Sequence, residues 1–434
     1  MERYEAYKDS GVEWIGEIPK HWTCANLGSI SSQRKNLNRD GSVDNVLSLS
    51  YGTIKRRLLD NTGLLPESFN TYNVIEEGDV VLRLTDLQND QKSLRVGLCH
   101  EKGVITAAYT TLEPQSIDSR YLFYNLATFD YWKGFYGLAG GVRQSLTFDG
   151  IRGLRFPLPS VLEQQAIADF LDSKTAEIDS LVADCVREVE LLQEYRKAVI
   201  SETVTKGLDP DAPMKDSGVE WIGEIPTRWE IQQLGRLCTR IFDGPFGSNL
   251  KSNDYVDGGV RVVRLENLKY LHFDETKESY VTPEKYETIN QHTVYPDDLI
   301  VATFIIDSVK ACRLPSNIGF AVNKADCLGV RTGEGLDVDY LKYYLSSCQV
   351  FDYLSGLTHG STRQRINTTQ LKALLVLLPP KNVQHAIVTH LDTKIAEIDS
   401  LIENKQSMVD RLREYRKSLI SEAVTGKFKV PGID

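Results

Sequence analysis

The sequence lacks the marks of a membrane, secreted or disulfide-bonded protein. Among its 434 residues, no apolar run approaches the roughly 20 residues of a membrane-spanning helix. The N-terminal MERYEAYKDS is charged and has no apolar stretch, so we expect no signal peptide. The seven cysteines are scattered, odd in number and never spaced C-x-x-C. We therefore expect a cytoplasmic protein with reduced thiols and no zinc site.

Catalytic signatures are also missing. There is no G-x-x-x-x-G-K-[ST] loop for nucleotide phosphates, no G-x-G-x-x-G, no G-x-S-x-G and no H-E-x-x-H. His385 and His390 lie five residues apart on a predicted helix, so they do not face one site and are expected to line its surface. These absences favour a chain that is not an enzyme and holds no metal or cofactor, although residues brought together only by folding leave a self-sufficient nuclease open.

Excess positive charge is lacking as well. The net charge is -10, and the binding of duplex DNA rests on Lys and Arg neutralising phosphates. By block, the charge is -1 for residues 1–157, -5 for 158–206, -5 for 207–378 and +1 for 379–434. Local basic stretches exist all the same, such as Lys55, Arg56 and Arg57. If the chain holds DNA, we expect a more basic partner to supply much of the phosphate contact.

A duplicated plan is the most informative feature of the sequence. The dodecamer KDSGVEWIGEIP runs over Lys8–Pro19 and again over Lys215–Pro226, 207 residues apart. LDSKTAEIDSL is echoed by LDTKIAEIDSL, and EYRKAVISETVT by EYRKSLISEAVT, both 220 residues apart and in the same order. Between these matched segments, the two halves hardly resemble each other. The chain is therefore an internal repeat of matched framework and unmatched inserts.

The matched segments that follow the inserts are predicted to be long helices. Apolar residues recur by threes and fours over about four heptads, and each helix of about 44 residues would be about 65 Å long. Ser160 and Glu163 form a predicted capping box, while Gly207 and Gly426 stand where C-cap glycines belong. Two unrelated surface helices are the alternative to an antiparallel coiled coil. The predicted coiled-coil seam consists of Leu171, Ile178, Val182, Val189, Leu192, Val199, Leu391, Ile398, Ile402, Val409, Leu412 and Leu419.

The unmatched inserts favour β-rich α+β domains. They contain short runs rich in β-branched residues, such as GDVVLRLTDL and DDLIVATFII, followed in each half by a predicted helix. The predicted fold class is α+β, with two β-rich domains separated by two long helices that form an antiparallel coiled coil with pseudo-twofold repetition. The predicted blocks are a first domain at 1–157, a first long helix at 158–206, a second domain at 207–378, and a second long helix with its tail at 379–434.

Polar loops in the inserts carry the chemistry of nucleic-acid recognition. TDLQNDQKSLRVG offers Gln and Asn for adenine and Arg for guanine, while DGPFGSNLKSNDY offers Ser, Asn, Lys and an exposed Phe. For both loops, a plain solvated turn is an equally good interpretation. The candidate DNA-binding residues are Tyr51, Lys55, Arg57, Gln88, Asn89, Lys92, Arg95, Arg143, Gln144, Phe246, Ser248, Asn249, Lys251, Arg264, Asn267, Arg363 and Gln364.

The dodecamer has a structural interpretation that we prefer to a binding one. Its Trp14, Ile15 and Ile18, with their repeats Trp221, Ile222 and Ile225, are expected to pack where a domain meets the helix pair. The chain stops where a third copy would begin, so we expect Lys8 near the C-terminal end of the second helix.

The layout resembles the specificity subunit of Type I restriction-modification systems. The resemblance rests on YKDSGVEWIGEIPKHW at the start of a half and on RQSLTFDGIRGLRFPLPSVLEQQAIADFLDSKTAEID leading into a long helix. It implies two target-recognition domains that each read half of a split site in double-stranded DNA. It also implies that the helix pair sets the spacing and docks two methyltransferase subunits, which restriction and translocase subunits join. S-adenosylmethionine, ATP and Mg²⁺ would then belong to the partners. A protein-interaction scaffold with two β-rich modules on a coiled-coil strut is the alternative.

Overall fold

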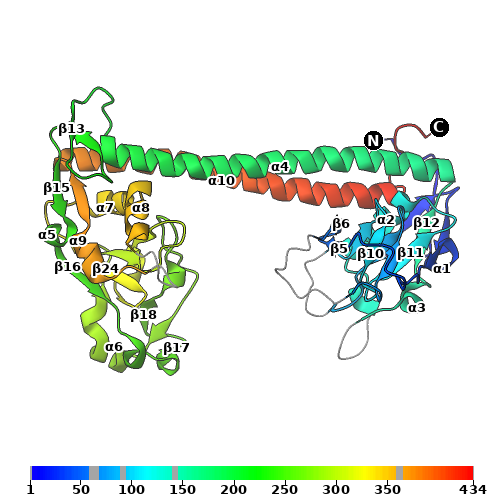
Figure 1. The fold of residues 1–434 in the computed structure, drawn as a ribbon, viewed down its shortest axis with the longest axis horizontal. Coiled ribbons are helices and arrows are strands. Elements are labelled where there is room, and N and C mark those ends of the chain that lie inside the picture. The colour runs from blue at the N-terminus through cyan, green and yellow to red at the C-terminus, as the bar shows by residue number, and fades with distance from the viewer. Residues whose placement is uncertain (1, 58–67, 88–93, 139–144, 358–364, 434) are drawn as a thin grey trace. The chain divides into compact units, whose positions relative to one another are not determined.

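The computed structural model describes residues 2–57, 68–87, 94–138, 145–357 and 365–433 (Figure 1). The chain divides into two compact units. Unit 1 comprises Met1–Val186 and Ser407–Asp434, and unit 2 comprises Arg187–Gln406. Each unit therefore joins one globular part to a portion of both long helices. The four blocks predicted from the sequence cut the chain at other positions, because they follow the order of the repeat along the sequence.

The globular part of unit 1 consists of short strands and three helices. Short, β-branched runs between Gly, Asp and Pro account for the many three-residue and four-residue strands. The elements are β1 (Tyr7–Asp9), β2 (Glu17–Pro19), β3 (Thr23–Asn26), α1 (Leu27–Ile30), β4 (Ser31–Gln33), β5 (Leu47–Ser50), β6 (Thr53–Arg56), β7 (Asn73–Ile75), β8 (Val80–Leu82), β9 (Val96–Leu98), β10 (Gly103–Ile105), β11 (Thr110–Pro114), α2 (Ser119–Tyr131), the 3-10 helix Tyr136–Leu138, α3 (Phe148–Ile151) and β12 (Arg155–Leu158).

Unit 2 has a larger globular part with more irregular segments. Its elements are β13 (Met214–Asp216), β14 (Glu224–Pro226), β15 (Glu230–Gln233), α5 (Leu234–Leu237), β16 (Cys238–Asp243), the 3-10 helices Gly247–Asn249 and Ser252–Asp254, β17 (Tyr255–Val256), β18 (Val260–Val263), the 3-10 helix Leu265–Asn267, β19 (Tyr280–Val281), α6 (Pro283–Ile289), the 3-10 helix Asn290–His292, β20 (Thr293–Val294), β21 (Leu299–Ala302), β22 (Ala311–Arg313), the 3-10 helix Ser316–Ile318, β23 (Ala321–Asn323), β24 (Cys327–Thr332), α7 (Val338–Leu345), α8 (Cys348–Gly356), α9 (Thr368–Ala373) and β25 (Leu375–Leu378).

The two units repeat the same arrangement of strands. The order β4-β11-β8-β9 in unit 1 matches β16-β24-β21-β22 in unit 2, and all pairs in both sheets are antiparallel. A second set of strands repeats as well, because β6-β5 and β10-β7 in unit 1 match β19-β18 and β23-β20 in unit 2, and a parallel contact links the two pairs in each unit, through the Val46–Val104 bridge in unit 1 and through β18 and β23 in unit 2. Unit 2 extends this set with β17. The predicted α+β class with internal repetition is confirmed.

The two long helices have the predicted extents and ends. Helix α4 (Val161–Lys206) has 46 residues and α10 (Lys381–Val424) has 44. Gly207 and Gly426 follow them with φ of 81° and 68°, the left-handed conformation of a C-cap glycine. At the start of α4, the backbone N–H of Ser160 donates to Glu163, and the backbone N–H of Glu163 donates to the Ser160 hydroxyl. The predicted capping box is therefore present.

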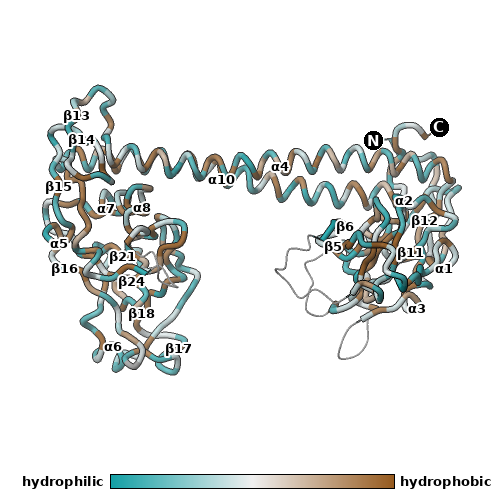
Figure 2. The backbone as a smooth tube through the Cα atoms, viewed as in Figure 1, coloured by the Kyte–Doolittle hydropathy of each residue, from teal (hydrophilic) through white to brown (hydrophobic). Residues whose placement is uncertain are grey.

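In both units, α4 and α10 run antiparallel and bury the predicted seam. All twelve seam residues are buried or half-buried, and Figure 2 shows hydrophobic and hydrophilic residues alternating along both helices. Within unit 1, the Cys185 thiol lies 3.7 Å from the sulfur of Met408. Within unit 2, the polar seam residue Lys405 forms an ion pair with Glu188. Lys405 is thus accommodated by a partner on the opposite helix.

A matched pair of ion pairs crosses the helix interface. In unit 1, Arg416 of α10 lies 2.9 Å from Asp179 of α4 and donates at 3.1 Å to the hydroxyl of Tyr131 on α2. In unit 2, Arg196 of α4 pairs with Asp399 of α10, and its guanidinium lies 5.2 Å from the ring centre of Tyr270. The two arginines and the two aspartates are repeat counterparts. Each arginine therefore links both helices and the globular part of its own unit.

A second set of repeated contacts docks α2 and α7 onto the helices. The Tyr121 hydroxyl donates to the carbonyl of Val424 at 3.0 Å, and its counterpart Tyr340 donates to Leu377 at 3.0 Å and to Val204 at 3.4 Å. Both tyrosines are fully buried. The hydroxyls of Tyr124 and Tyr343 each donate at 2.6 Å to an aspartate of the long helix, Asp172 and Asp392 respectively. The same hydrogen bonds thus fix both globular parts.

The predicted helix over Tyr340–Leu354 is interrupted. Helix α7 ends at Leu345, and α8 begins at Cys348 with Ser347 as its N-cap residue. The Ser347 hydroxyl donates to the Tyr344 carbonyl at 2.7 Å, so the serine satisfies the end of α7 with its own side chain. Local side-chain bonds of this kind compete with helix propagation. In unit 1, the matching stretch has no serine pair, and α2 continues.

We predict that Arg416→Ala lowers the free energy of unfolding by about 2 kcal/mol, because one substitution removes contacts to Asp179 and Tyr131 in a half-buried site. Arg196→Ala should cost a similar amount in unit 2. Arg413→Ala is the matched control, because Arg413 is exposed and pairs only with Asp410 on its own helix. Urea unfolding measures all three. Equal unfolding midpoints for Arg416→Ala and Arg413→Ala would contradict the proposed role of the ion pair.

Candidate nucleic-acid interface

The hairpin β5-β6 presents an aromatic residue and two cations at the surface of unit 1. Tyr51 and Gly52 form its two-residue turn with φ of 47° and 79°, as in a type I′ turn. Tyr51 is 75% exposed, an unusual position for a large aromatic ring. Lys55 and Arg57 are exposed on the returning strand and just beyond it. This arrangement suits contact with a polyanion.

Arg95 does not reach the surface, which corrects its predicted base contact. The side chain is fully buried. Its guanidinium donates to the backbone carbonyls of Arg83, Thr85 and Asp86 at 2.8 to 3.1 Å, and to the Tyr136 hydroxyl at 2.9 Å. Arg95 therefore holds together the segment that follows β8. The sequence pattern could not reveal this, because a polar loop and a buried arginine clamp have the same composition.

Part of the predicted set lies where the structure gives no description. Residues outside the described ranges are Gln88, Asn89, Lys92, Arg143, Gln144, Arg363 and Gln364. Their predicted roles stay predictions. Ser248 lies in the short 3-10 helix Gly247–Asn249, within the predicted loop of unit 2.

The predicted loop of unit 2 is anchored at both ends and exposed at its tip. The His292 Nδ1 donates to the Asp243 carbonyl at 2.6 Å, and the Lys251 backbone N–H donates to Asp254 at 2.6 Å. A Cβ on Gly244 would come within 2.2 Å of the Asn323 carbonyl, so this position requires glycine. Between the anchors, Phe246 is 53% exposed. Asn249 and Lys251 are exposed as well.

Arg264 and Asn267 sit in a small motif after β18 and differ in access. Asn267 is fully buried, and its amide donates to the carbonyls of Asp274 and Lys277. Its predicted DNA contact is therefore wrong, because the amide is used within the fold. Arg264 is half-exposed, pairs with Glu266 at 2.8 Å, and lies 5.7 Å from the ring centre of Tyr255. Arg264 remains available to a ligand at the surface.

Arg365 and Lys324 lie near this loop, although neither was among the candidate DNA-binding residues. Lys324 lies 6.0 Å from the ring centre of Tyr255, and Arg365 lies 5.9 Å from that of Phe246. Arg365 is visible in the sequence as part of a local basic stretch with Arg363. Nothing in the local sequence marks Lys324, because only the fold brings β23 beside the loop.

Both copies of the dodecamer pack against the long helices, as predicted, because their isoleucines share a hydrophobic core with residues of α4 and α10. Ile15, Ile18 and their repeats Ile222 and Ile225 are buried, while Trp14 and Trp221 are half-buried. Each copy folds as a two-stranded hairpin, β1-β2 or β13-β14. In both copies a Gly backbone N–H donates at 2.9 Å to the Asp two residues before it. The two identical amino-acid sequences thus form the same hairpin with the same Asp–Gly hydrogen bond.

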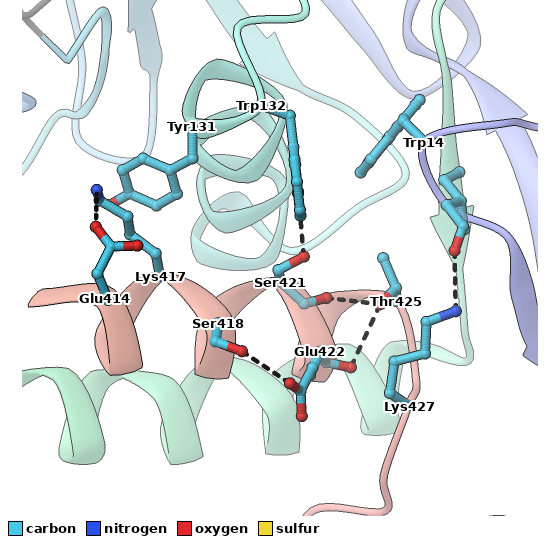
Figure 3. Close-up of a pocket in the computed structure, with 11 residues that line it drawn as sticks. Trp14, Tyr131, Trp132, Glu414, Lys417, Ser418, Ser421, Glu422, Thr425 and Lys427 are labelled. Atoms are coloured by element: carbon cyan, nitrogen blue, oxygen red, sulfur yellow. Dashed lines mark hydrogen bonds and ion pairs between the residues drawn. The ribbon is translucent and has the colours of Figure 1, made fainter. Parts of the chain in front are cut away.

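The C-terminal end of α10 meets the first dodecamer (Figure 3). The Lys427 ammonium donates to the carbonyls of Ile15 and Glu17 at 2.9 and 2.6 Å, and burial lowers its pKa below the usual value. The Tyr7 hydroxyl donates to the Lys427 carbonyl at 3.2 Å. The expected position of Lys8 beside the end of the second helix is therefore confirmed. Beside it, Trp14, Trp132 and Ser421 line a groove of about 490 Å³.

Neither a metal centre nor a membrane helix is found in the described part of the chain. No three His, Cys, Asp or Glu side chains gather there in a way that could hold a metal ion. None of its helices combines the length and the apolar character needed to cross a bilayer.

Comparison with known sequences supplies the family. Residues 226–410 match the family model described as the Type I restriction modification DNA specificity domain. The Type I restriction enzyme MjaVIII specificity subunit of Methanocaldococcus jannaschii is 23% identical over 430 residues, which cover 96% of this chain and 95% of that protein. The chain is thus similar to Type I restriction-modification specificity subunits over nearly its whole length. A second relative from that organism, the putative MjaX specificity subunit, is 27% identical over 323 residues, or 72% of this chain and 69% of its own.

Solved structures agree with the specificity-subunit fold. One chain, from a structure described as the basis of complex assembly and conformational transition of the type I R-M system, has a TM-score of 0.67. The HsdS subunit from Thermoanaerobacter tengcongensis has a TM-score of 0.50. Both are 16% identical, and the matches cover 94% of this chain and 98% of the solved chains. At this identity the likeness bears on fold, and it supports two α+β parts joined by long helices.

We predict that Arg95→Ala and Arg57→Ala separate structural from DNA-contacting arginines. Arg95→Ala should remove the hydrogen bonds from the buried guanidinium to three backbone carbonyls and reduce stability by about 2–4 kcal/mol, seen as a lower melting temperature. Arg57→Ala should leave the melting temperature unchanged and weaken DNA binding. The slope of the logarithm of the binding constant against the logarithm of the salt concentration should become shallower by about the amount expected for one phosphate contact.

Thermal unfolding and binding at several salt concentrations test both variants in complex with co-expressed methyltransferase. An Arg95→Ala protein as stable as wild type would contradict the buried clamp. Unchanged binding by Arg57→Ala would remove the β5-β6 hairpin from the interface.

Proposed function

We propose that this chain is the non-catalytic DNA sequence-recognition subunit of a cytoplasmic Type I restriction-modification complex. Each globular part reads one half of a bipartite site in double-stranded DNA. The helix pair sets the distance between the half-sites and docks two methyltransferase subunits. Methylation, cleavage and translocation, with S-adenosylmethionine, ATP and Mg²⁺, belong to the methyltransferase and restriction subunits.

One observation carries the proposal. The two units share their strand order, their tyrosine bonds to the helices and their Arg–Asp pairs, and they differ in the amino-acid sequence of the strands and loops of their globular parts. A shared framework suits partners that are the same at both ends. Different surfaces suit two different half-site sequences. A bipartite DNA target and a pair of identical enzyme subunits meet both requirements.

An exposed apolar stripe on the helices supports the docking of two identical partners. Leu181 and Leu401 are repeat counterparts, as are Tyr195 and Tyr415, and about half of each side chain is exposed. Each leucine stands one position before a seam residue, and each tyrosine stands one position before the interhelical arginine Arg196 or Arg416. Unit 1 carries Leu181 with Tyr415, and unit 2 carries Leu401 with Tyr195. Each unit thus presents one leucine and one tyrosine at equivalent, partly exposed positions. Exposed apolar side chains of this kind are typical of a contact surface for another protein.

We predict that Leu181→Asp and Leu401→Asp each remove one methyltransferase subunit from the complex, and that the double variant removes both. A buried carboxylate in an apolar contact is costly, so loss of one subunit per substitution is expected. Native mass spectrometry of the co-expressed complex gives the stoichiometry. Gln193→Asp is the control, because Gln193 is exposed on the same helix outside the stripe. Two methyltransferases retained by Leu181→Asp would exclude the stripe as the docking surface.

We also predict that exchanging residues 25–138 for the matching region of another specificity subunit changes one half of the methylated site. The other half and the spacer should stay as they were, because unit 2 and the helices are untouched. Sequencing of methylated DNA from cells with the hybrid gives the answer. A methylation pattern identical to that of the parent would contradict the proposal that each globular part recognises one half-site.

The acidic net charge of -10 favours one competing function, a scaffold that binds proteins through its two β-rich modules. The two functions differ in a gel-shift assay with co-expressed methyltransferase. Sequence-specific retardation of a duplex supports DNA recognition, whereas its absence over all duplexes tested supports the scaffold.

A further inference from the structure

The exposed ring of Phe246 ends a stack of alternating aromatic and cationic groups in unit 2. The Arg365 guanidinium lies 5.5 Å from the ring centre of Phe304 and 5.9 Å from that of Phe246. Phe304 is half-buried, Arg365 is about one-third exposed and Phe246 is the most exposed of the three. The order from inside to outside is therefore ring, guanidinium, ring, at distances typical of cation–π contacts.

The inner part of the stack is held by the backbone. Phe304 and Arg365 form an antiparallel bridge, and the Ile366 backbone N–H donates to the Thr303 carbonyl at 2.8 Å. The Arg365 guanidinium also donates to the Ala325 carbonyl at 2.6 Å and lies 3.8 Å from the Asp326 carboxylate. Its position is thus fixed by groups other than Phe246, so Phe246 is placed over a ready-made cation.

The outer part is held by the anchored loop. His292 fixes the Asp243 carbonyl, Gly244 packs against the backbone of Lys324, and the Asn249 backbone N–H donates to the Phe246 carbonyl at 2.8 Å. An exposed phenyl ring on a braced turn loses little conformational entropy when it binds. The Phe246 ring lies over the Arg365 guanidinium and is 53% exposed.

Further cations of unit 2 lie near the anchored loop. Lys324, against whose backbone Gly244 packs, and Arg264 both lie within 6.0 Å of the Tyr255 ring centre. Glu266 and Asp326 offset two of the charges in this region, since Glu266 pairs with Arg264 and Asp326 lies near Arg365. The region therefore combines an exposed apolar ring with a modest positive charge.

We infer that Phe246 inserts between two adjacent base pairs of the half-site read by unit 2. The inserted ring would extend the stack of Phe304, Arg365 and Phe246 by a base. Apolar side chains that enter a base step partly unstack it and kink the duplex by roughly 20–90°. The step that unstacks most easily would then contribute to specificity without a hydrogen bond to its bases. This inference rests on the proposed function and adds a means of reading DNA by its deformability.

The test compares the wild-type complex with the variants Phe246→Ala, Phe246→Trp and Phe320→Ala, each with co-expressed methyltransferase. The probe is an unmodified duplex of about 30 base pairs that carries the sequence methylated by the wild-type complex in cells, with a fluorophore at each end. Phe320 is the control, because it is 38% exposed in the same unit and packs against Tyr286. Energy transfer reports the bend, and titration gives the affinity.

We expect Phe246→Ala to reduce both the bend and the affinity, the latter by about tenfold, as for loss of one base–aromatic stack. Phe246→Trp should retain both, and Phe320→Ala should behave as wild type. Specific binding by Phe246→Ala with the bend and affinity of wild type would overturn the insertion and leave DNA recognition intact. A wild-type complex without sequence-specific binding would overturn the proposed function as well.

Discussion

The arginine–aspartate pairs between α4 and α10 are the contacts on which the rest of the architecture depends. Arg416 joins Asp179 on the opposite helix to Tyr131 of the first globular part, and Arg196 joins Asp399 to Tyr270 of the second. Each guanidinium is therefore shared among three elements that are distant in sequence. Planar, permanently charged arginine suits this task better than lysine, because it can stack and donate several hydrogen bonds at once.

The repeat separates what must stay the same from what must differ. Buried tyrosines, the helix caps and the dodecamer hairpins recur with the same hydrogen bonds in both units. The loops and turns between the repeated strands differ in sequence. The exposed aromatic residues lie on such segments: Tyr51 in the turn between β5 and β6, and Phe246 in the loop between β16 and β17. The matched segments therefore form the common framework of the two units, and the unmatched segments between them form the surfaces that differ.

Periodic and repeated features were predictable from sequence, and contacts across the fold were not. The heptad spacing and the C-cap glycines predicted both long helices closely, because helix signals are local. The repeated dodecamer predicted its own packing role. Arg95 and Asn267 were misread, since a polar residue in a polar loop can as well be a buried clamp. Lys324 gave no signal at all, because its neighbourhood exists only after β23 has joined the sheet. The break between α7 and α8 depended on serine hydroxyls whose capping bonds compete with the helical pattern.

The central claim is that two different surfaces on one framework read two different half-sites. The most direct measurement is the sequencing of modified bases in cells that express this chain with its cognate methyltransferase. The account predicts one recurring bipartite motif, with two unlike specified halves and a non-specified spacer of constant length. Methylation at a single uninterrupted motif, or at two half-sites with a variable gap, would contradict it.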